Sequence, residues 1–109
     1  MQGFDMQALG EIFKQAHDMH RKLHQLKLDL KERIVEASAG GGLVTAQANG
    51  IGELLALRIQ REAVDPDDVE MLEDLVVAAV NEALKKALAL HHDELRRLRL
   101  ELGLPAELF

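Results

Sequence analysis

Residues 34–60 read IVEASAGGGLVTAQANGIGELLALRIQ, and the pattern within this stretch decides the fold. The run of three glycines at 40–42 is a strong breaker of regular structure, and Asn49-Gly50 is a turn signal. These breaks leave three short β-compatible segments, which are 34–38, 43–49 and 53–60. We therefore predict three strands joined by glycine turns, forming an antiparallel meander with one covered face.

Alternation along the strands predicts which of their residues are covered. Successive side chains of a strand point to opposite faces of the sheet, so every second residue shares a face. In the second and third strands, the apolar residues that alternate in this way are Val44, Ala46, Ala48, Leu55, Leu57 and Ile59. We expect these side chains to pack in the core or between subunits.

The stretch before the strands, 5–33, has the pattern of a long helix. Its apolar side chains recur at alternating intervals of three and four residues, at Leu9, Ile12, Ala16, Met19, Leu23, Leu26 and Leu30. This heptad spacing gives one continuous apolar seam along the helix.

A second long helix is predicted after the strands, at 66–102. Asp65 can cap the free N–H groups at its start, and Pro66 suits the first helical position. Gly103 and Pro105 are the signals that stop it.

The apolar stripe of this second helix changes partway along. The first half presents Val69, Leu72, Val76, Ala79 and Ala83, and the second half presents Leu84, Leu88, His91, Leu95, Leu98 and Leu102. We infer that the first half packs on the sheet and that the second half extends beyond it. A protruding amphipathic half-helix needs either the first helix or a partner chain to cover its stripe, so the pattern favours a dimer.

Length and composition limit the class of protein. The 109 residues suffice for a single domain, 1–109, with a short tail at 103–109. Cysteine is absent, which excludes disulfides and thiolate chemistry, and the lack of Tyr and Trp removes the usual stacking platform for single-stranded nucleic acid. No apolar run reaches the roughly 18–20 residues of a membrane-spanning helix, and the N-terminus lacks the pattern of a signal peptide. We expect a cytoplasmic protein that does not enter a membrane.

The charge of the chain is distributed unevenly. The formal net charge of −6 disfavours simple electrostatic attraction to DNA. However, residues 65–83 hold seven acids and no base, whereas residues 84–102 hold five bases and three acids. Acids near a helix start complement the positive end of the helix, which explains much of the acidic block. The regions 1–38 and 84–102 can therefore still present basic surface locally.

Two stretches of the sequence also carry a resemblance to a known family. They read GGGLVTAQANG at 40–50 and VDPDDVEMLEDLV at 64–76, the latter continued by AAVNEALKKA at 78–87. Together with the helix at 5–33, they are similar to the YbaB/EbfC family of small bacterial nucleoid-associated proteins. The family tail is commonly rich in Gly, Met and Pro, whereas here a basic, leucine-rich helix continues to residue 102.

The resemblance implies a fold and a function. The implied fold is α+β, an α-β-β-β-α subunit with a three-stranded antiparallel sheet and two long helices, which pairs into a tweezer-like homodimer. The projecting helices of that dimer are the implied DNA-binding parts, with little sequence preference. The basic residues that occupy these helices here are Lys14, Arg21, Lys22, Lys27, Arg96, Arg97 and Arg99.

Each group of basic residues also has a structural interpretation. Phosphates attract Lys and Arg whatever the DNA sequence, which favours the DNA interpretation. Cations near the end of a helix, such as Arg99, equally complement its dipole. The lysines of the first helix equally form a solvated face with interspersed acids such as Asp18.

Other candidate sites are weaker. His17, His20 and His24 share one face of the first helix, but no carboxylate pattern completes a metal site there. A pH-sensitive DNA or dimer surface is the better hypothesis for them, because histidine gains charge near neutral pH. Ser38 and Thr45 are the only hydroxyl side chains. We therefore expect no enzyme, no cofactor, no metal and no small-molecule substrate.

The sequence thus predicts a nucleoid-associated bacterial protein that binds double-stranded DNA as a homodimer, chiefly through phosphates, with a role in chromosome organisation or gene regulation. The residues expected to build the core or the dimer are Val44, Ala46, Leu55, Leu57, Ile59, Leu72, Val76, Leu95 and Leu98. The alternative is a protein-interaction adaptor that uses the leucine seam between Leu84 and Leu102 without tight DNA binding.

Overall fold

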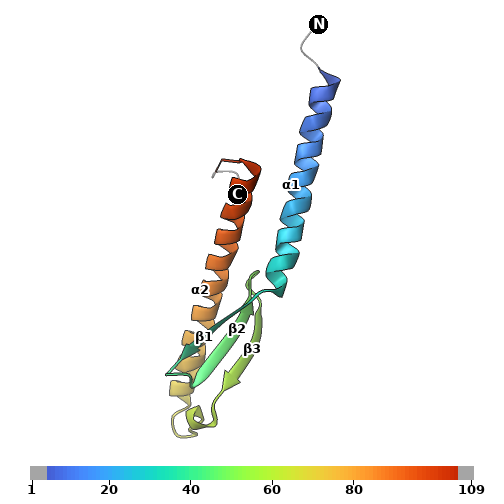
Figure 1. Cartoon of the computed structure of the whole chain (residues 1–109). Coiled ribbons are helices and arrows are strands. Elements are labelled where there is room, and N and C mark those ends of the chain that lie inside the picture. The colour runs from blue at the N-terminus through green and yellow to red at the C-terminus, as the bar shows by residue number, and fades with distance from the viewer. Residues whose placement is uncertain (1–4, 106–109) are drawn as a thin grey trace.

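The computed structural model describes residues 5–105. In chain order, one long helix precedes a small sheet and a second long helix follows it. The predicted order α-β-β-β-α is confirmed, and the ends of the predicted domain at 1–4 and 106–109 lie outside the described residues. The molecule measures 81 × 21 × 19 Å, with a radius of gyration of 21.4 Å. A compact domain of this size has a radius of gyration of about 13 Å. The chain is therefore strongly elongated, because both helices run past the sheet at one end (Figure 1).

The sheet has the order β1-β2-β3, with β1 at Ile34–Ala39, β2 at Val44–Asn49 and β3 at Leu54–Ile59, all antiparallel. The turn between β1 and β2 contains the three glycines, and all of them have a positive φ, between 65° and 97°. Side chains are strained in that region of backbone space, which is why the turn is built from glycine. Gly40 is also crowded, since an added Cβ would lie 2.8 Å from the side chain of Leu75.

The register of β3 corrects one sequence prediction. Leu57 lies opposite Ala46 and Ile59 opposite Val44, as alternation predicts, but the register shifts between Gln47 and Ala48. This bulge places Leu54, not Leu55, opposite Ala48. An extra residue in one strand moves the following alternation by one position, so the apolar face of β3 consists of Leu54, Leu57 and Ile59.

The start of the second helix, α2 at Val69–Leu102, is also corrected. The prediction had the helix begin at residue 66 with Asp65 as its cap, but Asp68 is the N-cap and its side chain accepts a hydrogen bond from Met71 N. Asp65 instead accepts one from Asp67 N, so Pro66 lies in a turn before the helix. Both aspartates can cap, and the turn decides between them. A short 3₁₀ helix, η1 at Arg61–Ala63, links β3 to this turn.

The core is made mostly of alanine. Ala79, Ala83 and Ala87 of α2 are buried against β1 and β2, and the cluster is completed by Ala37, Val44, Ala46 and Ala48. Small side chains let the helix approach the sheet closely, but each removes little apolar surface from water. Val69 was predicted to join this seam and is 52% exposed, because α2 has only begun at that point.

The joint between the first helix, α1 at Met6–Glu32, and the sheet lies at the turn after β2. Gly50 N donates to the backbone oxygens of Leu30, at 2.8 Å, and of Arg33, at 3.0 Å. The buried Asn49 side chain accepts from Ile51 N and Glu53 N and donates to the Glu53 carboxylate at 2.7 Å. The Asn-Gly pair therefore closes the β2–β3 turn and attaches α1 to it.

Candidate nucleic-acid interface

The site predicted from sequence lies on the part of α1 and α2 that projects beyond the sheet. The two helices run antiparallel there, and α1 reaches further than α2 (Figure 1). Two ion pairs connect them: Lys22 Nζ lies 3.2 Å from Glu101 Oε1, and Arg33 Nη1 lies 3.2 Å from Glu94 Oε1. These pairs place residues 22–33 alongside residues 94–101.

The apolar seams of the two helices meet over this length. Leu98 is 8% exposed, and Leu26 of α1 lines the same hollow as Leu98. Leu95 and Leu102 are half-buried, whereas Leu88 is 57% exposed. The first helix therefore covers the end of the leucine seam of α2 and leaves Leu88 uncovered.

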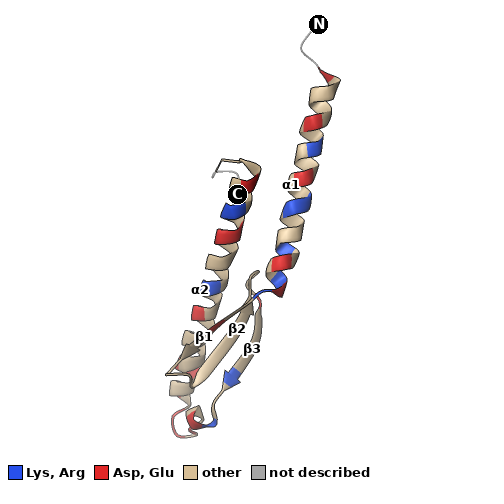
Figure 2. Ribbon diagram, in the orientation of Figure 1, with Lys and Arg blue, Asp and Glu red and all other residues tan. Residues whose placement is uncertain are grey.

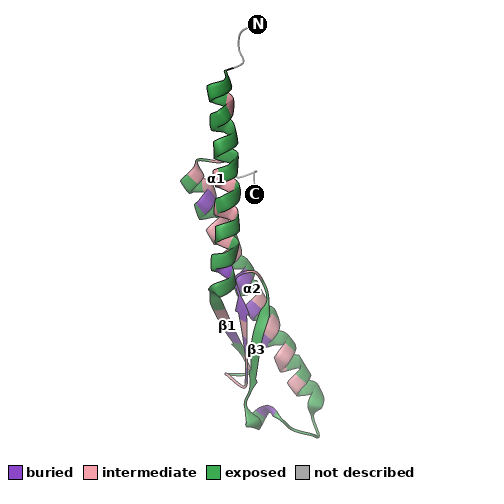
Figure 3. Ribbon diagram, turned by 90° about the vertical axis from the view of Figure 1, so that its right-hand side faces the viewer, coloured by how far each residue is buried: buried purple, intermediate pink, exposed green. Residues whose placement is uncertain are grey.

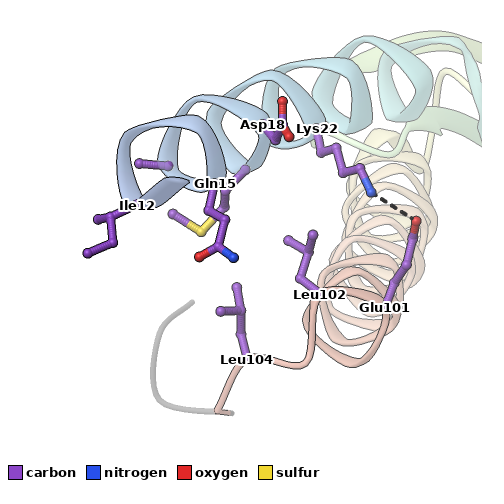
Figure 4. Close-up of a pocket in the computed structure, with 9 residues that line it drawn as sticks. Ile12, Gln15, Asp18, Lys22, Glu101, Leu102 and Leu104 are labelled. Carbon is purple, nitrogen blue, oxygen red and sulfur yellow. Dashed lines mark hydrogen bonds and ion pairs between the residues drawn. The ribbon is translucent and has the colours of Figure 1, made fainter. Parts of the chain in front are cut away.

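A hollow of about 510 Å³ lies between the helices near the tip of α2 (Figure 4). Its lining mixes apolar side chains, such as Leu102 and Leu104, with Gln15 and the Lys22–Glu101 ion pair (Figure 4). Among residues 5–105, no hydroxyl or histidine side chain lines it. The hollow is therefore a gap between two incompletely packed helices.

Most of the predicted DNA-contacting residues are held in local ion pairs. Arg21 pairs with Asp18 at 3.7 Å, Arg96 with Asp93 at 3.5 Å and Arg97 with Glu94 at 3.2 Å, in addition to the Lys22–Glu101 pair. Exposed pairs of this kind contribute about 0–1 kcal/mol, so a phosphate can replace the carboxylate. Within residues 5–105, no ion pair involves Lys14 or Lys27, and both are exposed.

The structure separates the three arginines of α2. Arg97 lines a hollow between the helices together with Lys22, Asp29 and Glu94. Arg96 and Arg99 line a different hollow, with His92 and Leu95, that belongs to α2 alone. The basic residues therefore do not form one patch, and acidic and basic segments alternate along both helices (Figure 2).

The acidic block lies far from the projecting helices. Residues 65–83 form the turn before α2 and its first half, at the opposite end of the molecule from the tips of α1 and α2 (Figures 1 and 2). Most of the excess negative charge of the chain is thus separated from the candidate interface. Surface potentials act locally because salt screens charges over about 10 Å at 0.1 M.

His17, His20 and His24 are all exposed on α1. Within residues 5–105, no group of three His, Asp or Glu side chains is placed to hold a metal ion. No helix in the same range is long and apolar enough to cross a membrane.

The predicted core or dimer residues divide into two groups. Val44, Ala46 and Leu98 are buried within the chain, and Leu72, Val76 and Leu95 are half-buried. Those on β3 are exposed instead, Leu55 by 48%, Leu57 by 41% and Ile59 by 38%, because α2 packs on β1 and β2 and hardly on β3 (Figure 3). The apolar face of β3 is therefore uncovered in a single chain.

The other face of the sheet is polar. Ser38 Oγ lies 2.9 Å from Thr45 Oγ1, and Gln47 donates to Glu36 at 2.8 Å. The two hydroxyl side chains of the chain thus hydrogen-bond to one another on an exposed surface.

Comparison with known proteins finds similar sequences and a similar structure over most of the chain. A nucleoid-associated protein of Thermodesulfovibrio yellowstonii is 48% identical over 96 residues, which is 88% of this chain and 84% of that protein. One of Pelotomaculum thermopropionicum is 44% identical over 89% of this chain and 92% of its own length. The crystal structure of the uncharacterized protein HP0035 from Helicobacter pylori matches with a TM-score of 0.63 and 27% identity, covering 93% of this chain and 97% of that one.

A family model also matches nearly the whole described chain. It covers residues 5–102, which include both helices, the three strands and every basic residue considered above. This chain is therefore a member of the YbaB/EbfC DNA-binding family.

Proposed function

We propose that this chain forms a homodimer that binds double-stranded DNA, mainly through phosphate contacts with little sequence preference, and associates with the nucleoid in the bacterial cytoplasm. The family and the names of the relatives support the DNA-binding and nucleoid parts. Bound to DNA in the nucleoid, the protein would act in chromosome organisation or gene regulation.

The observation that carries the proposal is the pair of projecting helices that carry cations, of which Lys22 and Arg99 are half-buried and the others are exposed. A helix pair that extends beyond its domain can reach a DNA backbone without moving the sheet. Its cations are Lys14, Arg21, Lys22, Lys27, Arg96, Arg97 and Arg99. Their carboxylate partners are exposed for the most part, so exchanging them for phosphates costs little. Such contacts position a protein on DNA and carry no sequence information directly.

The exposed face of β3 supports the homodimer. Leu54, Leu57 and Ile59 are 47%, 41% and 38% exposed and lie side by side on the strand face that continues the core. The alanine-rich core of one chain buries few large side chains, and a second copy would cover this face and add apolar burial. Two copies joined there would carry two helix pairs, one on each side of the DNA.

Fluorescence anisotropy of a labelled duplex, titrated with the protein at about 50 mM and about 200 mM salt, tests the DNA proposal, because phosphate contacts lose affinity steeply with salt. We expect micromolar or tighter binding that weakens with salt and is the same for two unrelated duplex sequences. Changing Arg96, Arg97 and Arg99 together to Glu should abolish it. An absence of binding at the lower salt concentration would leave the protein-interaction adaptor as the better function.

A further inference from the structure

The charges of α1 alternate along the helix (Figure 2) and are also sorted around it. Five exposed residues at alternating intervals of three and four form one line, here called the histidine–lysine stripe: His17, His20, His24, Lys27 and Lys31. A second line, here called the acidic stripe, runs through Glu11, Gln15, Asp18, Lys22, Gln25 and Asp29. Residues spaced in this way share one face of a helix. Each member of the first stripe directly follows, and each member of the second directly precedes, a residue of the apolar seam, so the stripes flank the seam on opposite sides.

Contacts between α1 and α2 show on which side of the helix pair each stripe of α1 lies. Lys22 of the acidic stripe pairs with Glu101, and Asp29 lines a hollow together with Glu94 and Arg97. One side of the helix pair therefore combines the acidic stripe with Glu94 and Glu101. Because the helices meet along their seams, the histidine–lysine stripe must lie on the other side.

The matching side of α2 is basic as well. His92, Arg96 and Arg99 lie across the seam residues Leu95 and Leu98 from the two glutamates, and they line one hollow together with a single acid, Asp93. The ion pairs at both ends of the helix contact place residues 22–33 alongside 94–101 in antiparallel order. His24 and Lys27 thus lie level with Arg99, and Lys31 lies nearer to His92.

We propose that DNA phosphates bind on the side of the helix pair that carries the histidine–lysine stripe with His92, Arg96 and Arg99, and that binding strengthens as the pH falls. This inference rests on the proposed function and narrows its contacts, since it leaves Lys22 and Arg97 on the side that faces away from the phosphates. Carboxylates on the opposite side repel phosphates, whereas the histidine–lysine stripe contains no carboxylate. Within residues 5–105, no ion pair involves Lys27 or Lys31, so no carboxylate has to be displaced from them.

Histidine supplies the pH dependence, because it gains a proton as the pH falls from about 8 to about 5. The charged groups around the three histidines of α1 are Lys14, Arg21 with its partner Asp18, Lys27 and Lys31 on the same helix. From α2 they face Arg99, and beyond it His92 and Arg96 with its partner Asp93. Cations dominate these surroundings and repel one another, and the negative charge of a bound phosphate offsets this repulsion, so phosphate binding and histidine protonation favour one another.

Two matched double variants test the side. Lys27→Gln with Lys31→Gln removes two positive charges from the proposed surface, and Lys22→Gln with Arg97→Gln removes two from the acidic side. Anisotropy titrations at fixed salt should show that the first variant loses at least about fivefold more affinity than the second, as expected if only the first removes phosphate contacts. Equal losses, or a larger loss for the second variant, would overturn the assignment of the side.

The pH dependence is tested with His17→Gln, His20→Gln and His24→Gln combined. Wild-type affinity should rise at least about threefold between pH 8 and pH 6, as protonated histidines add phosphate contacts, and the triple variant should lose most of this rise. His91→Gln should keep it, since His91 is half-buried beside Gly50 and Leu88. Circular dichroism checks that each variant remains helical. If the triple variant keeps the rise in DNA affinity between pH 8 and pH 6, the further inference alone is contradicted. If the wild type binds no DNA at any pH, the proposed function is contradicted as well.

Discussion

The backbone N–H of Gly50 donates a hydrogen bond of 2.8 Å to the carbonyl oxygen of Leu30. This bond joins the end of α1 to the turn between β2 and β3, so it fixes the place from which α1 projects. Leu30 itself is 1% exposed and is one of the few large side chains that are fully buried. The direction of the candidate DNA-binding helix is thus set at a joint where a glycine and a leucine are in close contact.

Gly50→Ala should destabilise the protein through this joint. An added Cβ would lie 2.8 Å from both the oxygen and the Cδ2 atom of Leu30. Overpacking of this kind costs about 1–3 kcal/mol, and urea denaturation followed by circular dichroism measures it. Gly10→Ala is the matched control, since nothing lies within 4 Å of its added Cβ and it sits inside α1. That change should stabilise the protein by about 0.5–1 kcal/mol. Equal effects of the two changes would contradict the close contact at Gly50.

Asn49→Ala should destabilise the turn after β2. The side chain is 1% exposed, and its removal leaves Glu53 N and the Glu53 carboxylate without their partner. Each lost hydrogen bond costs about 0.5–1.5 kcal/mol, because Glu53 is exposed and water replaces part of the interaction, and the loss is measured as a lower urea midpoint. Asn49→Asp should be more harmful at pH 7 than at pH 4 relative to wild type, because it brings a second carboxylate to Glu53 and the like charges repel only when both are ionised. An equal loss at both pH values would show that charge plays no part.

Leu57→Arg should dissociate the proposed homodimer without unfolding the subunit. Leu57 is 41% exposed on the uncovered face of β3. An arginine at this position is solvated in the single chain, but in the proposed dimer it would be buried against the apolar face of the partner. Sedimentation equilibrium at micromolar concentration should give the monomer mass for the variant. Arg58→Ala, one residue along, changes the opposite face of the strand and should leave the dimer mass unchanged. The reverse result would place the interface on the polar face of the sheet.

Glu94→Gln should loosen the contact between the two helices. The Glu94 side chain is 18% exposed and lies 3.2 Å from both Arg33 and Arg97. Because both arginines are more than half exposed, solvent screens these pairs, and we expect a loss of up to about 1 kcal/mol in urea denaturation. Asp93→Asn, next in the chain and 59% exposed, should cost less than about 0.5 kcal/mol. A larger cost for Asp93→Asn would mean that Glu94 does not hold the helices together.

Local signals in the sequence were sufficient for most of the secondary structure. Glycines at 40–42 adopt the positive φ that their turn requires, and Gly103 ends α2 in a left-handed conformation with φ 68°. These features depend on a few neighbouring residues, so they can be recognised from the amino-acid sequence alone. The start of α2 shows the limit of such reasoning, since Asp65 and Asp68 carry equally good capping side chains and only the turn around Pro66 selects the second.

Pairing between distant residues decided the rest. The bulge in β3 exchanges Leu55 for Leu54 on the apolar face, because the register depends on β2 and not on alternation alone. The candidate DNA-contacting residues were chosen from the sequence, and Lys31 was not among them. Its position continues the spacing of three and four residues that begins at His17, so the sequence did carry the signal. The heptad spacing by itself determines that α1 carries two stripes of different charge. The contact of Lys22 with Glu101 shows that the acidic stripe of α1 lies on the same side of the helix pair as Glu101 of α2. The relative orientation of two helices is fixed by the packing between them, so neither helix sequence alone determines it.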